Sequence, residues 1–234
     1  MFTIFRKIPL WLIIYFLLCG NADSQIINKF GLKGGALLNN LTSYDDDAVY
    51  TGFYRNYTEK SLLLSFDLGL FAEFFDSPKF CVSGELHYNV KGEENKNGVR
   101  ILAPDKTNPE LYTYQGISDR FSYISLQLLP QWRFELNSSD KLYIFAGPKF
   151  DYRIGNSNSD DIEGVEIPDS KVEFGFAAGI GNIMWELVYL ELKYEHSFTN
   201  VYSIKYGNEN YNRHNQTFML LMGISLKKLL KVNL

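Results

Sequence analysis

The sequence predicts an all-β protein: an eight-stranded antiparallel up-and-down transmembrane β-barrel with short periplasmic turns and long extracellular loops. Three observations lead to this prediction: a side-chain period of two, an alternation of short and long connections, and a secretory leader. Aromatic residues make up 16% of the chain, yet mean hydropathy is only -0.16. A membrane barrel combines both values, since only alternate residues of its strands face lipid.

The leader is expected to be a cleavable signal peptide over residues 1–24, with a basic start, an apolar run and a small-residue end. Its apolar run, residues 8–18, is too short to span a bilayer as a helix, which argues against a retained anchor. Cys19 invites a lipoprotein interpretation, but the bulky Leu18 before it disfavours lipidation. Residues 25–234 are then expected to form one outer-membrane barrel domain.

Alternating apolar and polar side chains identify the strands. In residues 80–90 one parity is Phe, Val, Gly, Leu, Tyr and Val, and the other is Cys, Ser, Glu, His and Asn. A strand with this pattern has one oily and one polar face, whereas a helix would scatter both sets. Glycines inside the strands are expected to ease tight curvature. The eight expected strands are 30–38, 62–74, 80–90, 121–135, 142–153, 171–181, 185–197 and 217–227.

The connections alternate between long and short. Because neighbouring strands are antiparallel, this alternation puts every long loop at one rim, as in outer-membrane barrels. The long connections are expected at 39–61, 91–120, 154–170 and 198–216, and the short ones at 75–79, 136–141 and 182–184.

Large aromatic residues on the outward parity are expected to form belts at the membrane boundaries, because an indole ring prefers oil while its N–H meets water. The alternative is that these rings form the core of a soluble, lipocalin-like barrel. One belt, beside the short turns, would contain Phe74, Trp132, Phe134 and Trp185, and the opposite belt Tyr88, Tyr152 and Tyr194.

The inward parity collects charges of both signs. Eight strands enclose a space only just wide enough for side chains, so these charges should pair and plug the lumen. The alternative is a narrow ion or proton path through Glu191, Glu85 and His87. The expected lumen cluster is Lys33, Asp67, Glu73, Glu85, His87, Arg133, Lys149, Asp151, Arg153, Glu173, Glu191, Lys193 and Glu195.

No motif indicates an enzyme, a cofactor or a metal site. His196 and Ser197 are adjacent in a strand and should face opposite sides, so they cannot act as base and nucleophile. His214 is expected in a solvated loop. Acidic runs at 45–47 and 160–163 could hold calcium, but their spacing matches no defined ligand pattern. Cys81 is the only cysteine beyond the leader, so no disulfide forms within the mature chain.

The expected partners are outer-membrane lipids and lipopolysaccharide, and other envelope proteins that contact the outer loops. Tyrosines in the first and last long loops suit such contacts, although they could equally cap the rim. They are Tyr44, Tyr50, Tyr54, Tyr57, Tyr202, Tyr206 and Tyr211, with Phe53. A net charge of -4 disfavours nucleic acid as a partner, and the protein is expected to be a monomer.

Five short segments carry a family resemblance. They are FGLKGG at 30–35, GELHY at 84–88, LQLLPQWRF at 126–134, YIFAGP at 143–148 and LELKY at 190–194. Together they make the chain resemble the PorT-like outer-membrane β-barrel domain typical of the Bacteroidetes, which is similar in architecture to the OmpA and OmpX barrels.

The resemblance implies the fold better than an activity, since some members of the family are linked to protein secretion or gliding. The chain departs from such barrels at its end, where a basic tail replaces the usual terminal aromatic residue. Three functions follow as hypotheses: a structural or surface-interaction barrel of the cell envelope, an accessory component of a secretion system, and an outer-membrane enzyme acting on lipid A. The first is preferred.

Overall fold

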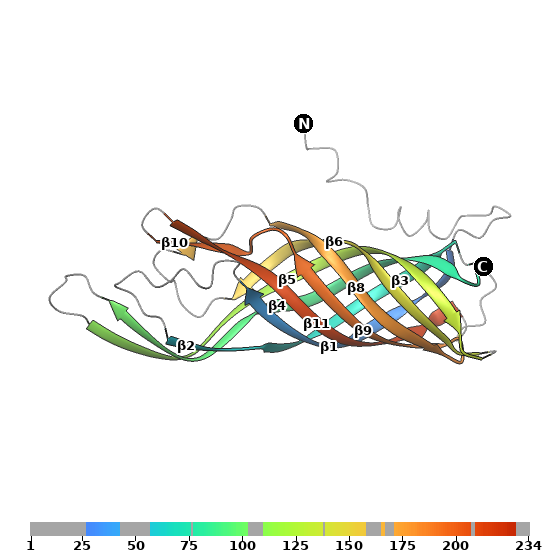
Figure 1. Ribbon diagram of the computed structural model, residues 1–234, viewed down its shortest axis with the longest axis horizontal. Coiled ribbons are helices and arrows are strands. Elements are labelled where there is room, and N and C mark those ends of the chain that lie inside the picture. Colours follow the sequence, from blue (N-terminus) through green and yellow to red (C-terminus); the bar gives the residue numbers. More distant parts are fainter. Residues whose placement is uncertain are drawn as a thin grey trace, which may run out of the picture.

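Eight strands form a closed antiparallel barrel in the computed structural model, which confirms the predicted fold class (Figure 1). The structure describes residues 27–42, 57–75, 77–102, 110–137, 139–157, 165–166, 171–206 and 209–227. The wall strands are β1 (Ile27–Thr42), β3 (Leu63–Phe74), β4 (Phe80–Leu102), β5 (Glu110–Glu135), β6 (Lys141–Ser157), β8 (Val172–Met184), β9 (Val188–Ser197) and β11 (Glu209–Ser225).

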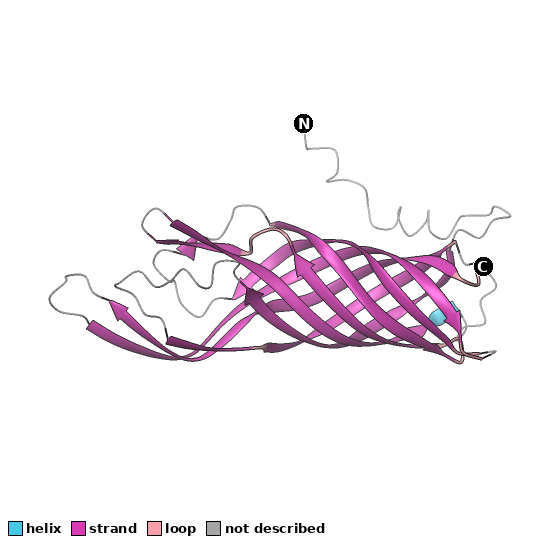
Figure 2. Cartoon of the chain, in the orientation of Figure 1, coloured by secondary structure: helices cyan, strands magenta, loops and turns pink. Residues whose placement is uncertain are grey.

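The first and last strands close the wall. Each strand pairs with the next one along the barrel, and β1 pairs with β11 from Gly31↔Ser225 to Thr42↔His214. Closure supplies hydrogen-bond partners to backbone groups that would otherwise face hydrocarbon at a sheet edge. Figure 2 shows a wall built of strand throughout. Among the described residues, no helix has the length and apolarity needed to cross a membrane.

Three short strands extend the sheet at the end with the long connections: β2 (Tyr57–Ser61), β7 (Val165–Glu166) and β10 (Tyr202–Tyr206). In Figure 1, β2 and the far parts of β4 and β5 project beyond the barrel, and β10 lies at the same end. The leader, the acidic runs 45–47 and 160–163, and the tyrosines at positions 44, 50 and 54 lie outside the described residues.

The prediction of a loop over residues 91–120 was wrong for most of its length. β4 pairs with β5 without a break in direction up to Leu102↔Glu110, so the two strands form one long hairpin. Backbone pairing can continue after the strands leave the membrane, where neither face needs apolar residues. The sequence pattern therefore ends before the strands do.

Smaller boundary errors have the same cause. Residues 182–184 were expected to form a turn, but β8 continues to Met184 and the turn occupies residues 185–187. β11 begins at Glu209, within the segment expected to be a loop.

Side chains alternate across the wall as the period of two requires. In β3 the outward Leu64, Phe66 and Leu68 are exposed, while the inward Leu63 and Asp67 are buried. A lipid-facing surface accounts for the exposed apolar band on this and the other wall strands.

The turn between β8 and β9 holds two bulky residues in the left-handed conformation, Trp185 at φ 54° and Glu186 at φ 56°. The Glu186 amide donates to the Ser139 carbonyl over 3.1 Å, and the Trp185 amide donates to Asp140 Oδ1 over 2.9 Å. The second bond holds the pKa of the Asp140 carboxyl below its ordinary value. These bonds join two neighbouring turns and compensate for the backbone conformation, which usually favours glycine or asparagine.

Glycines in the wall make room for rings that point inward. A Cβ added at Gly69 would overlap the His87 ring, one at Gly181 would overlap Tyr143, and one at Gly31 would meet Phe71. In a barrel this narrow, a large inward side chain fits where the facing residue has none. The glycines thus have a packing role beyond the curvature expected from the sequence.

Replacing Glu186 with glycine should stabilise the protein. Glycine adopts φ 56° without the clash that a Cβ causes, so we expect the free energy of unfolding to rise by about 1 kcal/mol. Urea unfolding in lipid vesicles measures the change. Glu135→Gly is the control, since Glu135 ends a regular strand and its replacement should lower stability. If Glu186→Gly and Glu135→Gly lower the free energy of unfolding by the same amount, the left-handed turn carries no strain.

Gly69→Ala should destabilise the protein by about 1–3 kcal/mol, because the new methyl group displaces the His87 ring from Asp67. The same unfolding assay tests this expectation. Gly84→Ala is the matched control, since its Cβ would lie 3.1 Å from the tip of the outward Phe74 ring, which can move. If the two alanine variants lose the same free energy of unfolding, then space for the His87 ring does not explain why residue 69 is glycine.

Candidate functional site

The candidate site is the charged interior of the barrel. The thirteen residues of the expected lumen cluster are all buried, with exposed fractions between 0% and 9%. They come from seven of the eight wall strands, so their side chains meet across the lumen.

The central part of the interior is built around two lysines and two glutamates. Lys33 Nζ lies 2.5 Å from Glu85 Oε1 and 2.5 Å from Glu191 Oε1. Lys193 Nζ lies 2.7 Å from Glu85 Oε2. The Tyr143 hydroxyl donates to Glu191 as well. Because these groups belong to four different strands, the contacts brace the wall across its interior.

His87 lies between two carboxylates of this central group. Its Nδ1 is 2.7 Å from Asp67 Oδ1 and its Nε2 is 3.0 Å from Glu85 Oε2. Only the doubly protonated imidazolium can donate through both nitrogens, so this geometry suits a charged histidine.

A charged His87 also balances the interior. The buried charges inside the described wall are six lysines and arginines against seven aspartates and glutamates, and His87 supplies the missing positive charge. The cations are Lys33, Lys91, Lys149, Lys193, Arg133 and Arg153, and the anions are Asp67, Asp151, Glu73, Glu85, Glu173, Glu191 and Glu195.

A second group of ion pairs lies closer to the outer end. Lys91 Nζ is 2.8 Å from both Asp151 Oδ2 and Glu195 Oε2, and Lys149 Nζ is 2.6 Å from Asp151 Oδ2. Gln127 links this group to the central one, because it donates to Glu195 and accepts from Lys193. Sequence reasoning missed Lys91, which was assigned to a loop although it continues the inward parity of residues 81–89.

Apolar side chains occupy the interior on either side of these ion pairs. One cluster has members close to the short turns and consists of Phe71, Leu129, Tyr143, Phe145, Ala177, Ile183 and Tyr189. The other is close to the long connections and consists of Leu41, Phe121, Tyr123 and Val201. The sequence pattern did not identify these inward rings. It assigns polar residues to the inward face, and an aromatic residue on that face does not fit the alternation.

Further polar contacts lie near both ends. Arg133 Nη2 is 2.6 Å from Glu73 Oε1, close to the short turns. Near the outer end, the Tyr123 hydroxyl and Asn215 Nδ2 both donate to Glu173. Arg153 Nη1 donates to the Val201 carbonyl over 3.1 Å.

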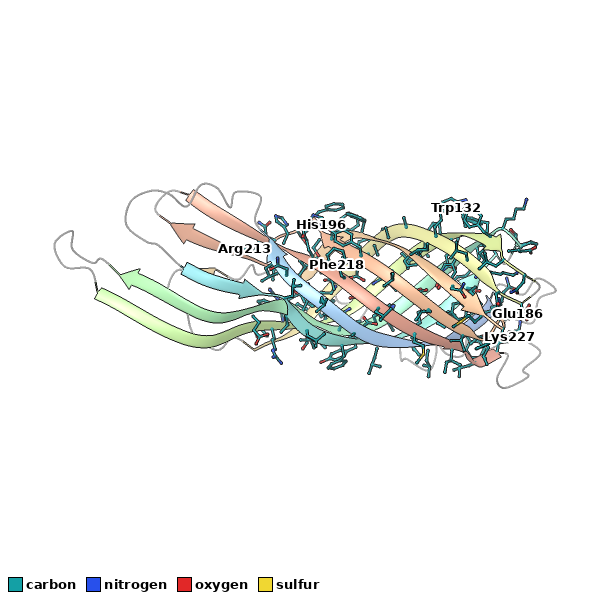
Figure 3. All side chains as sticks on the ribbon, turned by 60° about the horizontal axis from the view of Figure 1, so that its bottom comes forward. Trp132, Glu186, His196, Arg213, Phe218 and Lys227 are labelled. Atoms are coloured by element: carbon teal, nitrogen blue, oxygen red, sulfur yellow. The ribbon has the colours of Figure 1, made fainter. Side chains whose placement is uncertain are left out.

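The proposed aromatic belts lie on the outward face. Trp132, Phe134, Trp185 and Tyr152 are exposed, and Phe74, Tyr88 and Tyr194 are half-buried. Figure 3 shows Trp132 toward the same end of the barrel as Glu186, which belongs to a short turn. The Trp132 ring packs against the Phe80 ring with a centroid distance of 5.6 Å.

The histidines that the sequence singles out do not combine into a catalytic arrangement among the described residues. His196 is on the outward parity beside Phe176, whereas Ser197 is fully buried on the inward side. His214 belongs to β11 and not to a loop, which corrects the expectation from the sequence. No group of three or more metal-ligating side chains occurs in the described part of the chain.

A family model described as "Outer membrane protein beta-barrel domain" matches residues 22–203. No curated protein matches the chain. Among solved structures, Ail of Yersinia pestis in complex with sucrose octasulfate is 16% identical, with a TM-score of 0.40 over 84% of this chain and 97% of that one. OprG from Pseudomonas aeruginosa is 14% identical, with a TM-score of 0.44 over 84% and 95%. The outer membrane enzyme PagL is 12% identical, with a TM-score of 0.40 over 82% and 98%.

Lys33→Met should lower the free energy of unfolding by about 3–5 kcal/mol, because the buried carboxylates of Glu85 and Glu191 each lose the ion pair with Lys33. Urea unfolding in lipid vesicles measures the loss. Lys29→Met is the control: its amine is 4.0 Å from Glu73 and part of its side chain meets solvent, so we expect a loss under about 1 kcal/mol. A small loss for Lys33→Met would contradict a bracing role for the central group.

Proposed function

Because the chain belongs to the outer membrane protein β-barrel domain family, which places it in the outer membrane, we propose a barrel with a plugged lumen and a structural or surface-interaction role. The role is exercised through the segments that project beyond the outer end of the wall. Outer-membrane lipids and other envelope proteins are its partners, and the protein acts as a monomer without catalytic activity.

The observation that supports a plugged lumen is the set of ion pairs that cross the lumen between strands that are not neighbours. Lys33 and Lys193 each contact carboxylates from other strands at 2.5–2.7 Å. An ion crossing the barrel would have to separate these pairs and also pass the two buried apolar clusters. Separating buried pairs is costly because each partner is left without compensation.

The alternative path through Glu191, Glu85 and His87 is disfavoured by the same contacts. Each of the three groups is already hydrogen-bonded to another interior side chain. An ion moving along them would have to separate these pairs, and the apolar clusters on either side offer a proton few groups through which to continue.

The projecting hairpin supports the surface role. β4 and β5 remain paired beyond the barrel, with β2 alongside β4, and together they extend from the outer end in Figure 1. We also propose that the chain belongs to the narrower PorT-like family, which is supported by the five segments that resemble the PorT-like domain. An accessory role in secretion would use the same hairpin, but it rests on that resemblance alone.

A plugged lumen predicts that purified wild-type protein gives no stable conductance in a planar bilayer. Phe71→Ala with Tyr143→Ala should produce brief openings, because it removes two rings from the apolar cluster near the short turns. The double variant Phe66→Ala with Phe218→Ala is the control, since it removes two outward rings and should give no conductance. A large, steady wild-type pore would refute the plug, and it would leave the membrane barrel intact.

A further inference from the structure

The long hairpin of β4 and β5 leaves one strand edge open outside the barrel. Over residues 110–119, β5 pairs with β4 on one side. On its other side, the pairing of β5 with β6 ends at Arg120↔Ser157. Among the described residues, no strand pairs with this second side of residues 110–119, which we call the β5 edge.

The connection that follows β6 turns away from the β5 edge. Within it lies β7, whose Val165 and Glu166 pair with Ile204 and Ser203 of β10. β10 in turn pairs with β11, which lies across the wall from β5. Figure 1 and Figure 3 both show the hairpin and β10 on separate sides of the outer end. The described part of the chain thus leaves the β5 edge uncovered.

Backbone groups of alternate residues point toward the β5 edge. Along an antiparallel strand, successive residues form their backbone hydrogen bonds with opposite neighbours. The Arg133 amide donates to the Lys79 carbonyl, which lies on the β4 side, and the pairing of β5 with β4 keeps one register. Odd-numbered residues of β5 therefore bond to β4. The β5–β6 ladder is interrupted beside Pro130, an even-numbered residue without an N–H, as this assignment requires. The residues whose N–H and C=O groups face the β5 edge are Glu110, Tyr112, Tyr114, Gly116 and Ser118.

The β5 edge lacks the features that usually protect a sheet edge from pairing. Lysine, proline, a bulge or a very short strand serves that purpose in other proteins. Residues 110–119 contain no lysine and no proline, and they span about 33 Å. Between Glu110 and Asp119 all eight residues are uncharged, and they include leucine, isoleucine, threonine and two tyrosines, which favour strands. An edge of this length and composition suits the addition of a further strand.

We propose that the β5 edge binds an extended segment of another polypeptide, which adds a strand to the hairpin. The inference deepens the surface-interaction role proposed above and rests on it. Both ends of the edge are acidic: Glu110 lies at one end, and at the other Asp119 pairs with Glu93 of β4, so that two acids outnumber Arg120. The partner segment therefore has uncharged strand-forming residues in its middle and a basic residue at each end.

A second copy of this chain fits the β5 edge less well. Two copies in one membrane have the same orientation, so a two-fold axis along the membrane normal cannot make their β5 strands antiparallel. Copies in facing membranes can pair antiparallel, but full overlap of the two edges places Glu110 opposite Asp119 at both ends. Like charges directly opposite each other destabilise a strand pair. The edge therefore favours a different polypeptide.

The test measures, by fluorescence anisotropy, the binding of a labelled peptide to the full protein in nanodiscs. The peptide has four Thr-Val repeats with a lysine at each end. Tyr114→Pro removes an N–H from the β5 edge and should weaken binding at least about ten-fold, whereas Tyr114→Thr keeps the N–H and should bind as the wild type does. Tyr112→Pro should weaken binding similarly. A peptide with aspartate in place of both lysines should bind at least about five-fold more weakly at low salt.

Heat-modifiable migration on gels establishes that each variant is a folded barrel before binding is measured. Equal binding by Tyr114→Pro and Tyr114→Thr would overturn the proposal, and so would equal binding of the lysine and aspartate peptides. A wild-type dimer in native mass spectrometry that Tyr114→Pro dissociates would assign the edge to a second copy and overturn it too. Conductance recordings on the same samples test the plugged lumen separately. A wild-type barrel that gives no conductance and binds no peptide would therefore overturn the proposal for the β5 edge alone.

Discussion

The structure depends on the pairing of its first strand with its last. Hydrocarbon offers no hydrogen-bond partner, so a sheet can cross a membrane only when it has no edge. The β1–β11 ladder, which begins at Gly31↔Ser225, removes that edge. Because the closed wall has only eight strands, its interior is narrow.

A narrow interior explains the side chains inside it. Lys33 and Lys193 must lie close to Glu85 because eight strands leave no room for water shells around each charge. The same shortage of space explains why glycines such as Gly69 face large rings such as His87. Charge balance and close packing are thus consequences of closure, and they serve stability whether or not the outer surface binds a partner.

The sequence was sufficient to predict the fold, because a lipid-facing band imposes a period of two on every strand that crosses it. It was insufficient beyond that band: β4 continues to Leu102 through residues of no fixed pattern. Among interior residues, charges such as Glu195 stood out on the polar parity, whereas Tyr189 did not, since an inward ring resembles an outward one in sequence. Contacts across the lumen, such as Lys91 with Asp151, depend on register, which a single sequence does not specify.

Closure by the two ends of the wall also has a consequence for biogenesis. Gly31 and Ser225 are separated by most of the chain, so the seam between them can form only after the final strand has been delivered. Until then β1 and the strand next to the gap present open edges, which invite pairing with other chains. A polypeptide that stops before β11 would keep both edges open, and its cell would need chaperones to hold it apart from its neighbours.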